Sequence, residues 1–162
     1  MTSVAITGHR GLPPATLALV DRALRLEVAA RVRPGGPGLT GVSCLADGPD
    51  SLFAQAILDV GGRLIAVIPA WRYRASLPAV HHPVYDRLLA AADRVIALDR
   101  EESNSAAHQA GSLRMLDEAD ELLAVWDGLP ARGFGGTADV VATARARGLP
   151  VTVLWPPGAE RP

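Results

Sequence analysis

The chain has 162 residues, 49% of them hydrophobic and 20% charged, and its formal net charge is -1. This composition excludes a disordered chain and predicts one domain, residues 1–162, around a single hydrophobic core. Because the charge is nearly balanced, we expect no nucleic-acid partner and no membrane partner. The basic residues are all arginine, which excludes lysine nucleophiles and Schiff bases.

In chain order, short apolar runs alternate with stretches whose apolar residues recur every three or four positions, a pattern typical of βαβ units. The predicted strands are residues 3–7, 38–43, 63–68, 94–98, 121–126 and 150–154. The predicted helices between them are residues 14–31, 50–60, 83–92, 106–117 and 137–147. Two longer connections, residues 70–82 and 99–105, are expected to be mobile loops over a site.

The strand runs VAIT, LIAVI and LLAVW are apolar on both alternating faces, as parallel strands covered by helices on each side require. Right-handed crossovers then predict an open, doubly wound, Rossmann-like α/β sheet. The sequence shows no signal peptide and no apolar run of membrane-spanning length. Because Cys44 is the only cysteine, no intrachain disulfide is possible, and we expect a cytoplasmic protein.

Candidate ligand-binding residues follow three of the predicted strands, where parallel sheets bind their ligands. After the first strand, a glycine lets backbone amides approach an anion, and an arginine offers a fork for phosphate. Before the last helix, glycines and a threonine combine free N–H groups with the positive end of the helix dipole. The candidates are Gly8, His9 and Arg10 after the first strand, Gly48 and Asp50 after the second, and Asp127, Gly135, Gly136 and Thr137 after the fifth.

Each of these residues also has an ordinary structural role available to it. Gly135 and Gly136 would serve equally well as a turn before a Thr137 N-cap, and Asp47 or Asp50 as a cap of the second helix. Arg10 would serve as a surface ion pair. The Gly-x-Gly-x-x-Gly fingerprint and the Walker loop are absent after the first strand, which argues against an NAD dehydrogenase or a P-loop NTPase.

Three segments together resemble the SLOG superfamily, which includes DprA and the LOG phosphoribohydrolases: TGHR, LADGPDSLFAQAIL, and DELLAVWDG followed by GFGGTADVVATARARGLPV. The resemblance implies a strand order of 4-3-2-1-5-6. It implies that Gly8 and Arg10 contact a nucleotide or its phosphate, that Gly48 and Asp50 line the same pocket, and that the 135–137 turn holds phosphate. It adds Arg114, at a position where small members carry an arginine.

The chain departs from the LOG enzymes at the residue that is thought to act on the N-glycosidic bond. Alignment on Gly136 and Thr137 places Val140 at the position of the LOG glutamate, and a valine cannot transfer a proton. Asp139 lies about 100° around the helix from that position. A DprA-like role is disfavoured because the chain lacks the additional DprA domains and a basic surplus.

Cysteine, histidine and aromatic residues elsewhere in the chain are further candidate site residues. Cys44 is favoured as a small buried residue over a thiolate nucleophile. The four histidines have no carboxylate at ligand spacing, so we expect no metal. Aromatic and cationic side chains at 71–74 are either a lid that stacks on a base or an ordinary surface loop.

We therefore expect a sensor or binding module for a nucleotide or nucleotide-derived metabolite such as AMP, ADP-ribose or NAD, with no certain cofactor and no identified catalytic residue. The alternatives are a nucleotide N-glycosidase or phosphoesterase that uses Asp50, Asp127 or Asp139, and a scaffold whose pocket is filled. A bacterial source is expected from the composition. We also expect a homodimer formed through the apolar faces of helices 83–92 and 106–117.

Overall fold

The computed structural model describes residues 2–36, 38–131 and 136–162. Six parallel strands form one sheet in the order β4-β3-β2-β1-β5-β6, which confirms the Rossmann-like α/β fold and the strand order. The elements are β1 (Thr2–Gly8), α1 (Pro14–Arg31), β2 (Leu39–Ser43), α2 (Pro49–Asp59), β3 (Arg63–Ile68), α3 (Tyr73–Ser76), η1 (Ala79–His81), α4 (His82–Ala91), β4 (Arg94–Ala97), α5 (Ser105–Asp117), β5 (Glu121–Val125), α6 (Thr137–Ala146) and β6 (Val151–Leu154).

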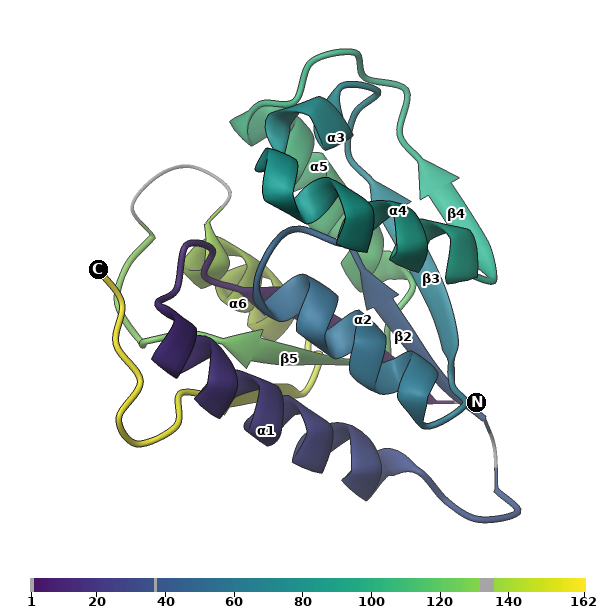
Figure 1. Cartoon of the computed structure of the whole chain (residues 1–162). Coiled ribbons are helices and arrows are strands. Elements are labelled where there is room, and N and C mark those ends of the chain that lie inside the picture. Colours follow the sequence, from purple (N-terminus) through teal and green to yellow (C-terminus); the bar gives the residue numbers. More distant parts are fainter. Residues whose placement is uncertain (1, 37, 132–135) are drawn as a thin grey trace.

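Helices cover both faces of the sheet: α1, α2 and α4 lie on one face, and α5 and α6 on the other (Figure 1). Consecutive residues of β1 show why both faces are needed. Val4 and Ile6 belong to the cluster beneath α1 and α2, whereas Ala5 belongs to the second cluster, which includes residues of α5 and α6. The central strands therefore bury side chains in both directions, as their unbroken apolar runs predict.

The 70–82 connection, predicted to be a mobile loop, contains the short helices α3 and η1. Two side chains anchor it: Tyr73 is buried, and His81 Nε2 lies 3.0 Å from Leu45 O and 3.2 Å from Ser51 Oγ. Trp71 is 69% exposed. Sequence pattern missed these short helices because their burial comes from contacts with distant turns.

The apolar faces of α4 and α5 are buried within the chain itself. Tyr85 and Leu88 of α4, and Met115 and Leu116 of α5, belong to one core cluster. Those faces therefore do not form the exposed surface through which self-association was predicted, and dimerisation itself stays a prediction. Among the described residues, no helix combines the length and apolar character needed to cross a membrane.

Candidate functional site

A pocket of about 280 Å³ lies at the carboxyl ends of the central strands. Turns that are far apart in sequence meet there because parallel strands all end at the same edge of the sheet. Six of the ten residues singled out from the sequence line it: Gly8, His9, Arg10, Asp50, Gly136 and Thr137. Gly135 lies outside the described residues.

The β1–α1 turn enters the pocket at Gly8, where the backbone passes very close to the first turn of α2. A Cβ atom at Gly8 would lie 2.7 Å from Cβ and 2.8 Å from Cγ of Pro49. Real Cβ atoms do not approach this closely, so only glycine lets β1 and α2 keep their present separation. Gly8 therefore has a steric role, which adds to the backbone access predicted for it.

His9 turns inward and is buried against Asp127, the residue two positions after β5. His9 Nε2 lies 3.1 Å from both Oδ1 and the backbone N of Asp127. Burial acts to raise the pKa of Asp127. Hydrogen bonds from Leu129 N–H, the larger effect, and from His9 outweigh burial and hold this pKa below its ordinary value. Asp127 does not line the pocket; it is a carboxylate behind His9 that fixes the β1 and β5 turns to each other.

Arg10 lines the pocket, but its guanidinium already has a partner. Its Nε donates to Asp47 Oδ1 at 2.9 Å, and Nη2 lies 2.7 Å from the same oxygen. The Arg10 side chain is 43% exposed. The surface ion pair considered from the sequence is thus present, and the phosphate contact predicted for Arg10 stays a prediction.

Asp50 brings a carboxyl group to the pocket from the first turn of α2. Desolvation raises the pKa of this carboxyl to about 7, although the N–H of Ala46, 3.4 Å from Oδ2, and the charge of Arg10 favour its ionised form. Asp50 therefore changes charge near neutral pH. The N-cap of α2 is Gly48, with φ of 91°, so neither Asp47 nor Asp50 caps this helix. Gly48, which was predicted to line the pocket, does not line it.

Aromatic and neutral polar side chains form another part of the pocket wall. Tyr73 from α3 and His108 from α5 pack edge to face, with ring centroids 5.7 Å apart. Burial, and then the charge of Arg10, lower the pKa of His108, so its imidazole is neutral at neutral pH. Burial also raises the pKa of the Cys44 thiol, which keeps this side chain protonated.

The α6 helix begins at the pocket with Thr137, and Gly136 is its N-cap. The first N–H groups of a helix have no acceptor inside the helix, and they carry the positive end of its dipole. Val140, at the position of the LOG glutamate, is buried in the core and does not line the pocket. Thr137 is the first residue of α6, so it is not the N-cap that the purely structural role considered for this turn required.

Arg161 also lines the pocket, and sequence analysis did not find it. It follows β6, and no motif marks it. Arg114 does not reach the pocket: it pairs with Glu118 at 3.2 Å on α5. Over the described ranges, no three His, Cys, Asp or Glu side chains come together in a way that would hold a metal ion.

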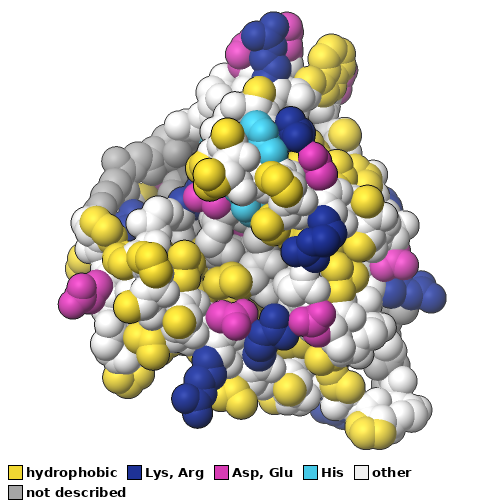
Figure 2. Space-filling model, in the orientation of Figure 1, with side chains coloured by type: hydrophobic (Ala, Val, Ile, Leu, Met, Phe, Trp, Pro, Cys, Tyr) yellow, Lys and Arg dark blue, Asp and Glu magenta, His cyan; other side chains and the backbone are white. Residues whose placement is uncertain are grey.

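Many surface charges of the described residues lie in ion pairs with a residue of opposite sign. Figure 2 shows arginine and acidic side chains interspersed on the face that carries α1, α2 and α4. Several are ion pairs, such as Arg25 with Asp59 at 2.8 Å and Arg74 with Asp86 at 2.7 Å. Positive charge is therefore not gathered into a stripe on this face.

Comparison with known proteins identifies the fold. No protein-family model and no curated protein matches the chain. Among solved structures, DNA processing protein A from Helicobacter pylori matches with a TM-score of 0.68 and 16% identity over 98% of this chain and 68% of its own. The structural-genomics protein TM1055 matches with a TM-score of 0.59 and 18% identity, over 93% of this chain and 72% of its own.

A third match is the Moco carrier protein of Chlamydomonas rheinhardtii, with a TM-score of 0.52 and 15% identity over 94% of this chain and 74% of its own. At these identities the matches show a shared fold. They confirm the fold and strand order that the resemblance to the SLOG superfamily implied, and membership of that superfamily stays a prediction.

The sequence-based exclusion of a nucleic-acid partner is wrong. The DNA processing protein from Helicobacter pylori, which has the same fold, is described as binding single-stranded DNA. The expectation relied on a net charge near zero, but binding depends on the local charge of one surface. Net charge therefore cannot exclude nucleic acid for this chain.

Proposed function

We propose that this chain binds a nucleotide or a nucleotide-derived metabolite in the pocket at the carboxyl ends of its strands, as a sensor or binding module. The observation that carries the proposal is the convergence of three separate turns on one pocket. Gly8 and Arg10 come from the β1–α1 turn, Ala46 from the β2–α2 turn with Asp50 just inside α2, and Thr137 from the start of α6. Such convergence combines backbone N–H groups, cationic side chains and a titratable carboxyl around one space.

The two kinds of pocket wall match the two parts of a nucleotide. The amides at the start of α6 and the arginines favour an anionic group. The aromatic pair Tyr73 and His108, with Ser112 and Met115, offers flat, apolar and hydroxyl surface for a base or a ribose. The pocket is also open, which counts against the scaffold alternative, because that reading expected side chains to fill it.

The test is isothermal titration with AMP, ADP-ribose, NAD and cyclic nucleotides, with a single-stranded oligonucleotide included because DprA binds such DNA. A Ser112→Phe variant places a ring in the pocket, and Ala106→Phe on the exposed side of the same helix is the matched control. We expect one ligand to bind with Kd below about 1 mM, tenfold weaker binding by S112F, and unchanged binding by A106F. No binding by any ligand, or equal binding by S112F, would contradict the proposal.

One observation favours an enzyme as the second candidate. Three carboxylates were considered as replacements for the LOG glutamate. Asp50 lines the pocket, whereas Asp127 and Asp139 do not. A pKa of about 7 suits a general acid or base at neutral pH. Incubation with nucleoside 5′-monophosphates, followed by detection of free base or ribose 5-phosphate, decides between the candidates, since turnover that is lost in Asp50→Asn requires the enzyme.

A further inference from the structure

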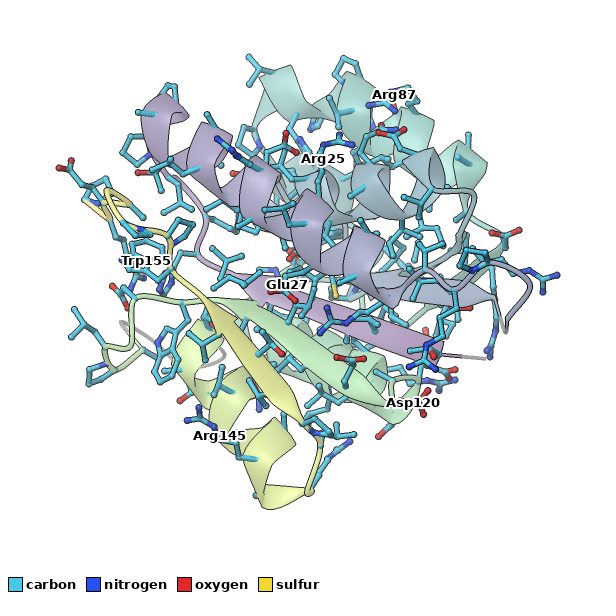
Figure 3. The ribbon with its side chains drawn as sticks, turned by 90° about the horizontal axis from the view of Figure 1, so that it is seen from below. Arg25, Glu27, Arg87, Asp120, Arg145 and Trp155 are labelled. Carbon is cyan, nitrogen blue, oxygen red and sulfur yellow. The ribbon has the colours of Figure 1, made fainter. Side chains whose placement is uncertain are left out.

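Residues 155–161, which follow β6 and are here named the strap, run back to the pocket. Glu160 fixes their backbone: its N–H donates to Thr16 Oγ1 at 2.9 Å, and its C=O accepts from the same hydroxyl at 3.2 Å. Trp155, labelled in Figure 3, meets the His9 ring edge to face with centroids 5.8 Å apart. Figure 1 shows the strap in yellow beside the first turn of α1.

Arg161, near the end of the strap, is mostly buried and weakly bonded. Its side chain is 16% exposed, and its one hydrogen bond among the described residues is from Nη1 to Asp127 Oδ2 at 3.5 Å. A guanidinium has five N–H donors in a planar fork. This single contact at the limit of hydrogen-bond distance leaves the other Arg161 donors without an acceptor among the described residues, and those donors still reach solvent.

The other arginine of the pocket lacks this property. Arg10 is 43% exposed, and two of its nitrogens lie within 2.9 Å of Asp47. Water and Asp47 together supply its acceptors. Of these two pocket-lining cations, Arg161 is therefore the one with the weaker hold on a carboxylate and the less exposed side chain.

We infer that Arg161 is the residue that binds the anionic group of the ligand, a phosphate ester, and that the strap holds Arg161 at the pocket. The inference rests on the proposed function and deepens it, because it names the side chain that makes an anionic ligand the preferred one. Asp127 holds one edge of the guanidinium, and the donors on the remaining edges bind the phosphate oxygens in a bidentate fashion.

Asp127 and Thr16 act as positioning residues for Arg161. Because hydrogen bonds keep the pKa of Asp127 low, its carboxylate stays charged and holds both His9 and Arg161. Thr16 is buried, and its hydroxyl is bonded to Glu160, the residue before Arg161. Loss of that hydroxyl frees the strap and leaves the arginine chemically intact.

The probe is inorganic phosphate, followed by NMR of the arginine Nε–H signals in the full chain. In the wild type we expect the Arg161 signal to shift and saturate as phosphate is added. Arg161→Ala is expected to weaken phosphate binding at least tenfold, and Arg161→Lys to restore part of it, since lysine keeps the charge but loses the fork. Arg22→Ala, an exposed arginine outside the pocket, is the matched control and is expected to bind as the wild type does.

Thr16→Val tests the strap separately, and it is expected to weaken phosphate binding although Arg161 is present. If R161A binds phosphate within twofold of the wild type while S112F binds AMP poorly, the role of Arg161 is wrong and the pocket function stands. If the wild type binds neither phosphate nor AMP, the proposed function fails and the inference with it. A parallel titration with AMP and a 5′-phosphorylated oligonucleotide shows which source of phosphate ester the arginine prefers.

Discussion

Replacement of Asp50 by asparagine should make the protein more stable at alkaline pH than the wild type. Asp50 sits in the pocket at the first turn of α2, where desolvation raises the pKa of its carboxyl from 3.8 to about 7. Asparagine has nearly the same shape, and its oxygen can still accept from Ala46 N–H. The substitution therefore removes the ionisation and leaves the local contacts in place.

The sign follows from proton linkage. The folded chain holds the Asp50 proton more tightly than the unfolded chain does, so stability falls as pH rises from about 4 to about 7. The rise in pKa is roughly three units, and each unit corresponds to about 1.4 kcal/mol. Ionised Asp50 thus costs the folded state about 4 kcal/mol at most, because the dipole of α2 favours the charged form and reduces the cost.

The assay is urea unfolding of the wild type and Asp50→Asn at a series of pH values from about 4 to about 8. The difference in the free energy of unfolding should be small at the acidic end and should grow in favour of D50N as pH rises. Asp86→Asn is the control, because Arg74 lowers the pKa of Asp86 and its stability effect has the opposite sign. A difference that is constant with pH, or that favours the wild type at alkaline pH, would refute the desolvation argument.

Two further predictions concern steric and polar constraints near the pocket. Gly8→Ala should lower the free energy of unfolding by about 1–3 kcal/mol, because the new Cβ meets the rigid ring of Pro49 at 2.7 Å; a change below about 0.5 kcal/mol in urea unfolding would show that the turn yields. Val140→Glu, which restores the LOG glutamate, should destabilise the fold by more than about 3 kcal/mol and create no hydrolase, since Val140 is buried in the core. Thermal unfolding and the nucleotide assay measure both effects, and a stable, active V140E would contradict the placement of this side chain.

Much of the fold was predictable because strand and helix signals are local. The helix predicted at residues 14–31 is α1 (Pro14–Arg31), and the strand at 63–68 is β3 (Arg63–Ile68), while the other long elements differ by a residue or so at their ends. Apolar period and turn residues carry this information within each segment. The α3 and η1 helices were not predictable in this way, since they are held by Tyr73 and His81 against distant parts of the chain.

In the candidate site, too, locally marked residues were predictable and contacts between distant residues were not. Glycines and charged residues directly after strands indicated Gly8, Asp50 and Thr137, because a parallel sheet places all its strand ends at one edge. The local pattern could not show that Arg10 pairs with Asp47, or that Asp127 lies behind His9. Such pairings depend on the separation of side chains from different turns, which sequence spacing does not encode.

By itself, then, the sequence determined the strands, the long helices and the edge of the sheet at which the candidate pocket lies, because these follow from periodicity and chain connectivity. Only the tertiary structure decided which charged side chains of the pocket are held in ion pairs and how closely. Arg161 enters the pocket through a strap that is fixed by Thr16, 144 positions before its partner Glu160. Burial raises the pKa of Asp50, and the packing of the strap leaves Arg161 with one weak contact; both arise only when distant segments pack together.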